Sequence, residues 1–96
     1  MLTRAQIEFK LKYLRPLFAE KYHESRIGDF VSYTNNNQHA RSDLDLLVEF
    51  SEPIGWKFFI FESFLEQSFG VPIDLVTVYS LKERMKESIL IQVNYV

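Results

Sequence analysis

Two aspartates one residue apart, Asp43 and Asp45, stand at the start of an apolar segment that runs to Phe50. Successive side chains of a β-strand point to opposite faces, so both carboxylates should share one face while the alternate apolar residues, from Leu44 to Phe50, point into a core. Two anions this close repel each other unless a cation lies between them. Carboxylates suit Mg²⁺, which completes its octahedron with waters and substrate phosphates. The segment therefore predicts a magnesium site for phosphoryl or nucleotidyl transfer.

A third carboxylate, Asp74, interrupts the apolar segment 71–78, which is predicted as another strand. A charged group that faced a core would be costly, so we expect Asp74 to lie beside Asp43 and Asp45 on an open face of the same sheet. Three acids gathered in this way are typical of a two-metal site. One ion would hold a triphosphate and the second would lower the pKa of an attacking hydroxyl. Asp74 would bind that second ion or accept the proton.

The remaining periodicity predicts helices between the strands. In chain order, we expect a helix over 3–14, a second, kinked helical piece after Pro16, strands over 25–31 and 43–50, a helix over 56–69 ended by Gly70, a strand over 71–78, and a last helix that a Ser80–Glu83 capping box opens toward Gln92. This order predicts one α/β (α+β) domain over residues 1–96. Its small mixed sheet should have about three or four strands, with helices on one face.

Composition excludes several other classes of protein. The formal net charge is -2 and no block of like charges occurs, so a protein that coats nucleic acid is not expected. Without cysteine the chain has no disulfide, no thiolate zinc site and no thiol nucleophile. No apolar segment approaches the roughly 18 residues of a membrane span, and the first residues carry no apolar signal segment. We therefore expect a cytoplasmic protein.

Three segments together resemble the minimal nucleotidyltransferase (MNT) family, the small single-domain branch of the DNA polymerase β-like superfamily. The family pattern is a strand that ends in Gly-Ser, a polar loop, Ser-Asp-x-Asp-Leu-Leu-Val-Glu-Phe, and a later strand containing Asp-Leu-Val-Thr. Here these appear as Val31-Ser32 with its loop, residues 42–50, and residues 74–77. The similarity covers nearly the whole chain and implies the nucleotidyltransferase fold. The family includes the MntA-like antitoxins of HEPN/MNT toxin–antitoxin systems.

The resemblance implies a role for each matching residue. It assigns Asp43 and Asp45 to Mg²⁺, Asp74 to the second metal and the base role, and Ser32 and Ser42 to nucleotide binding. The implied reaction moves AMP from the substrate ATP to a hydroxyl of a partner protein. That partner would be a HEPN-domain toxin, and this chain would be its antitoxin.

One position departs from the family pattern, because Val31 stands where relatives have glycine. Glycine lets the backbone turn sharply beside the phosphates, whereas a β-branched residue resists positive φ and adds bulk. An alternative is therefore a catalytically impaired antitoxin that neutralises its toxin by binding alone. Transfer to a small molecule such as an aminoglycoside is a third, weaker hypothesis, because no segment resembles a pocket domain for one.

The predicted helix 56–69 carries more apolar residues than one core-facing stripe requires. Trp56, Phe59 and Ile60 fall outside that stripe. Either a thick core takes all three, or they form an exposed apolar surface of the kind that marks a protein interface. We favour the interface, with the HEPN-domain toxin as partner in a hetero-oligomer and a homodimer as a further option.

Overall fold

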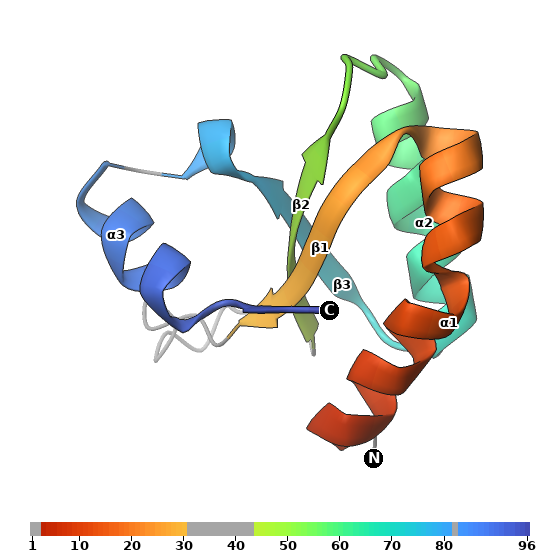
Figure 1. Cartoon of the computed structure of the whole chain (residues 1–96), viewed down its shortest axis with the longest axis horizontal. Coiled ribbons are helices and arrows are strands. Elements are labelled where there is room, and N and C mark those ends of the chain that lie inside the picture. The colour runs from red at the N-terminus through yellow and green to blue at the C-terminus, as the bar shows by residue number, and fades with distance from the viewer. Residues whose placement is uncertain (1–2, 31–43, 82) are drawn as a thin grey trace.

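The computed structural model describes residues 3–30, 44–81 and 83–96 (Figure 1). Its elements are helix α1 (Arg4–Tyr22), strands β1 (Glu24–Phe30) and β2 (Leu44–Phe50), helix α2 (Lys57–Phe69), strand β3 (Ile73–Thr77), the 3₁₀ turn η1 (Val78–Ser80), helix α3 (Glu83–Gln92) and strand β4 (Asn94–Tyr95). The strands form one sheet in the order β3-β2-β1-β4. Strand β2 runs parallel to β3, and the other pairs are antiparallel. The predicted mixed α/β sheet is therefore confirmed.

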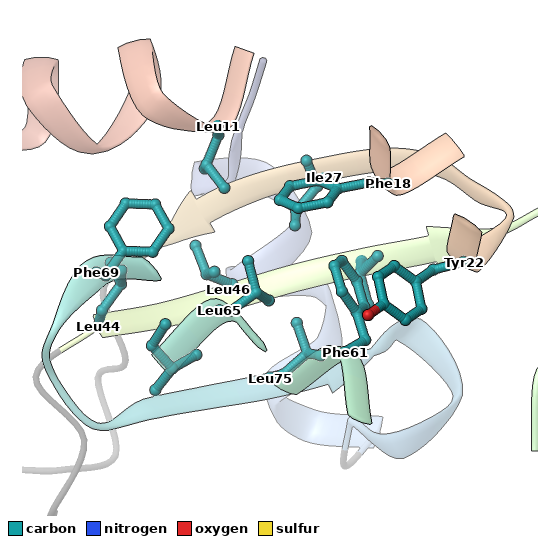
Figure 2. Packing of buried hydrophobic residues seen from close by; sticks show 12 residues of the cluster. Leu11, Phe18, Tyr22, Ile27, Leu44, Leu46, Phe61, Leu65, Phe69 and Leu75 are labelled. Carbon is teal, nitrogen blue, oxygen red and sulfur yellow. The ribbon is translucent and has the colours of Figure 1, made fainter. Parts of the chain in front are cut away.

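Helices α1 and α2 lie together on one face of the sheet and enclose the main core (Figures 1 and 2). Alternate residues of β2, among them Leu46 and Val48, point into this core and are fully buried. Aromatic rings from both helices pack over them. The Phe61 ring meets Phe18 edge to face at 4.9 Å between centroids and stacks on Tyr22 at 4.7 Å. Such ring pairs add stability beyond the apolar area that they bury.

The opposite face of the sheet carries a second, smaller cluster. Phe30 of β1, Leu47 of β2 and Ile89 of α3 are buried there together. Figure 1 shows α3 on the side of the sheet away from α1 and α2. The predicted placement of helices on one face holds for α1 and α2, whereas α3 covers apolar side chains that alternate out of the main core.

Helix α1 continues through Pro16 to Tyr22. The predicted helical residues after this proline are therefore confirmed, but the predicted division into two pieces is wrong. A proline inside a helix costs about 3 kcal/mol. Phe18 and Tyr22 beyond it are both buried, and each contributes about 1.5–3 kcal/mol by leaving water. Burial of these two rings therefore offsets the lost backbone hydrogen bond. The predicted capping box at Thr3 and Gln6 is confirmed.

The segment after β3 differs from the prediction in two ways. Ser80 does not cap α3, because its hydroxyl donates to the Thr77 carbonyl (2.8 Å) and accepts from the Thr77 amide (3.1 Å), which closes η1. Strand β4 was not predicted, and it pairs with β1 at Gly28. A Cβ at Gly28 would lie 2.6 Å from the Asn94 carbonyl oxygen, so this close approach requires glycine.

Gly70 ends α2 in the left-handed region, with φ +72°, as the sequence predicts. Over the described parts of the chain, no helix combines the length and apolar character needed to cross a membrane.

Candidate functional site

Asp45 and Asp74 are neighbours in the sheet. The parallel register of β2 and β3 pairs their Cα atoms directly, and adjacent strands lie about 4.8 Å apart. The residues on either side of Asp45, and those on either side of Asp74, point into the main core. Both carboxylates therefore project from the other face, away from α1 and α2. This is the arrangement predicted for these two acids.

Asp45 and Asp74, which we call the acid pair, lie where an apolar surface meets solvent. Phe30 is the register partner of Asp45 on β1 and is buried in the smaller cluster. Leu47 and Val76 belong to the same cluster and follow the two acids along their strands. Asp45 is half-buried and Asp74 is exposed. Asp74 is thus accessible from solvent at the border of an apolar cluster, whereas Asp45 is partly covered.

The donor set fits Mg²⁺. This ion is commonly held by one or two carboxylates and completes its shell with waters and phosphate oxygens. No group of three or more His, Cys, Asp or Glu side chains is arranged to hold a metal ion within the residues described. Asp43 precedes β2 and lies outside the described residues, as do Ser32, Ser42 and Val31. The structure thus places two of the three predicted metal ligands and leaves their roles as predictions.

Two glutamates of α2 were not identified from the sequence, although they contact the strand that carries Asp74. The Glu66 carboxylate accepts a hydrogen bond from the Ile73 amide at 3.0 Å, and that of Glu62 accepts one from the Leu75 amide at 3.4 Å. Their spacing of four residues on a helix beside an edge strand is a usable sequence signal only after the strand order is known.

Asp29 is a third carboxylate that was not identified from the sequence. It lies on the main-core face of β1 and is 5% exposed. One of its oxygens accepts from the Arg4 Nε at 2.9 Å, and the other has no hydrogen-bond partner. Burial, followed by the neighbouring Glu8 carboxyl, raises the pKa of Asp29 to about 6, while Arg4 opposes this shift. This group lies across the sheet from the acid pair.

The three apolar residues predicted to leave the core stripe of the second helix are all exposed. Trp56 is 82% exposed, and Phe59 and Ile60 are each 57% exposed. The centroids of the Trp56 and Phe59 rings lie 5.8 Å apart. We call Trp56, Phe59 and Ile60 the aromatic surface of α2. Its role as a partner interface stays a prediction.

Known proteins identify the family. A model of the nucleotidyltransferase domain matches residues 11–96. The chain is 37% identical over 97 residues to the protein adenylyltransferase MntA of Thermococcus cleftensis, which covers 100% of this chain and 98% of the relative. It is 39% identical over 83 residues to MJ0128 of Methanocaldococcus jannaschii, a candidate protein adenylyltransferase, with 85% of each chain covered.

The fold also matches a solved structure. One chain in the crystal structure of a mutant MntA-HpeT toxin–antitoxin superposes with a TM-score of 0.61 at 20% sequence identity, over 98% of this chain and 71% of the other. At that identity the match concerns the fold. The predicted family is confirmed: the chain belongs to the nucleotidyltransferase domain family and is a homologue of protein adenylyltransferases.

Proposed function

We propose that this chain is a Mg²⁺-dependent protein adenylyltransferase that acts as the antitoxin of a HEPN-type toxin. It transfers AMP from ATP to a hydroxyl of that toxin. The observation that carries the proposal is the direct pairing of Asp45 with Asp74 on the sheet face opposite α1 and α2, in a chain of this family. Similarity to a protein adenylyltransferase named MntA, a name that the solved toxin–antitoxin structure also carries, supports the antitoxin role.

At the acid pair, the reaction must stabilise the charge of the phosphates and remove the proton of the acceptor hydroxyl. The acceptor oxygen forms a bond to the α-phosphorus of ATP, the bond to the bridging oxygen breaks, and pyrophosphate leaves. Bound Mg²⁺ would neutralise the phosphates and lower the pKa of the acceptor hydroxyl. Asp45 and Asp74, with Asp43, would hold the ion, and Ser32 and Ser42 would bind the nucleotide. Asp74 is exposed, so a hydroxyl on a protein surface can reach it and pass its proton there.

The test is to remove each carboxylate charge singly. Asp45→Asn and Asp74→Asn should each lower AMP transfer by about two orders of magnitude or more, because a metal ligand is lost. Transfer is measured by the intact mass of a co-expressed HEPN-type toxin, which gains AMP. Glu20→Gln, on the exposed side of α1, is the matched control. Normal transfer by both aspartate variants would refute the metal assignment.

A binding-only antitoxin is the second candidate, and the aromatic surface of α2 favours it. Three exposed apolar side chains next to one another would gain free energy by docking on a partner without any chemistry. The same co-expression distinguishes the two functions. A toxin that gains AMP identifies the enzyme, whereas a tight complex of unmodified toxin identifies neutralisation by binding.

A further inference from the structure

Strand β3 is an edge of the sheet, and two of its outward amides find partners on α2. Unpaired donors on an edge strand would otherwise remain open to water or to another chain. Ile73 donates to Glu66 and Leu75 donates to Glu62, from one turn of α2 to the next. These two amides flank Asp74 in the chain. The strand segment that carries the exposed acid is therefore held from its outer side by two carboxylates.

Glu66 makes a second contact that fixes the turn into β3. Its main-chain carbonyl accepts the Gly70 amide at 2.8 Å, which closes the end of α2. Its side chain reaches the Ile73 amide at 3.0 Å. One residue thus bonds both ends of the short connection between helix and strand. These two hydrogen bonds of Glu66 fix the position at which β3 begins.

The end of α2 that carries Glu66 is itself anchored to α1. The Lys10 ammonium donates to the Ser68 carbonyl, and it lies 5.1 Å from the centroid of the Phe69 ring. A cation at the C-terminal end of a helix also interacts favourably with the helix dipole. Glu66 therefore acts from a fixed support rather than from a free helix end.

We propose that Glu66, assisted by Glu62, is a positioning residue for the Asp45–Asp74 pair. Metal sites tolerate displacements of only about 0.5 Å, and a slip of one residue in a strand turns every side chain to the other face. By holding the amides on both sides of Asp74, the glutamates keep this carboxylate opposite Asp45. The inference deepens the proposed function and rests on it.

The test compares Glu66→Ala with Glu66→Gln, whose amide oxygen can still accept the Ile73 bond. Gln67→Ala, on the exposed side of the same helix turn, is the matched control. Binding of Mn²⁺ alone is titrated by water-proton relaxation, and amide hydrogen exchange is followed at Ile73 and Leu75. Glu66→Ala should bind Mn²⁺ about tenfold more weakly, the loss typical of supporting residues at metal sites, and should exchange faster at Ile73. Glu66→Gln and Gln67→Ala should match the unmodified chain.

Faster exchange at Ile73 in Glu66→Ala, with Mn²⁺ affinity equal to that of Gln67→Ala, would overturn the inference and leave Glu66 as an ordinary edge cap. If Glu66→Ala does not fold, Glu62→Ala replaces it. A smaller loss of Mn²⁺ affinity is then expected, because the Glu62 bond is longer, and no loss would overturn the inference.

The proposed function fails by a different result. If Asp74→Asn binds Mn²⁺ and transfers AMP as the unmodified chain does, the acid pair is not the site. If Asp74→Asn loses both and Glu66→Ala loses neither, only the positioning role is refuted.

Discussion

At the scale of single residues, the charge of Asp29 depends strongly on its surroundings. Its buried carboxyl contacts Arg4 and lies beside Glu8, which also accepts a hydrogen bond from Asn94. Partial burial acts to raise the pKa of Glu8, but the neighbouring Asp29 carboxyl, the hydrogen bond from Asn94 and the charge of Arg4 outweigh it and lower that pKa. Of the two carboxyls, Asp29 therefore keeps its proton to the higher pH. Its contact with Arg4 joins β1 to α1.

The stability of the folded chain should consequently fall as pH rises toward the folded pKa of Asp29. The folded pKa of Asp29, about 6, exceeds its ordinary value of 3.8, so between these values the folded state binds more protons than the unfolded state. The associated stability is complete in acid and is lost as pH rises through the folded pKa. The loss is at most about 3 kcal/mol. Asp29→Asn should flatten the dependence between about pH 4 and about pH 6, measured by urea unfolding.

The difference in stability between the unmodified chain and Asp29→Asn reports on the coupled carboxyls of Asp29 and Glu8. Burial also raises the pKa of Glu24, with Arg15 opposing it, and this contribution has the same sign but remains in both proteins. An equally steep pH profile in Asp29→Asn would show that another group carries the dependence.

At the scale of elements, local sequence signals predict the end of a helix correctly where local backbone geometry determines that end. Gly70 ends α2 because its backbone conformation favours glycine, and this can be read from the sequence. Pro16 does not end α1, because burial of the Phe18 and Tyr22 rings stabilises the helix beyond it. That burial depends on tertiary packing and cannot be read from local sequence. Strand β4 is only two residues long and is defined by its pairing beside Gly28, so periodicity could not reveal it.

Pro16→Ala tests this account of α1. The change restores a backbone donor in mid-helix without touching the core, because Pro16 is exposed. It should stabilise the chain by about 1–2 kcal/mol, less than the full helix-interior cost of proline because the unfolded chain becomes freer. Thermal and urea unfolding measure the change. Ala19→Gly, at an exposed position of the same helix, should shift stability in the opposite direction; a destabilised Pro16→Ala would contradict the account.

At the scale of the whole molecule, the proximity of Asp45 and Asp74 could be predicted from the sequence. The hydrogen bonds that Glu62 and Glu66 accept from the strand that carries Asp74 could not. Strand alternation puts each acid opposite its apolar neighbours, and pairing of the two strands brings the acids to one face. Glu62 and Glu66 look like solvated helix residues in the sequence. Their role appears only once β3 is known to be the edge of the sheet.

The aromatic surface of α2 should matter to assembly more than to folding. Trp56→Ala is expected to weaken co-purification with a HEPN-type toxin by about tenfold or more, because exposed aromatic anchors often dominate an interface. It should leave the melting temperature nearly unchanged, since the side chain is 82% exposed. Tyr79→Ala, which removes another exposed ring from η1, is the control. Equal recovery of toxin by Trp56→Ala and the unmodified chain would exclude this surface as the interface.

The two glutamates on the outer side of β3 also bear on self-association. A bare edge strand can recruit a strand from another molecule and propagate ordered aggregates. Here carboxylates already occupy outward donors of that edge, and any incoming backbone would have to displace them. Sheet-to-sheet polymerisation through β3 is thereby disfavoured even in concentrated protein.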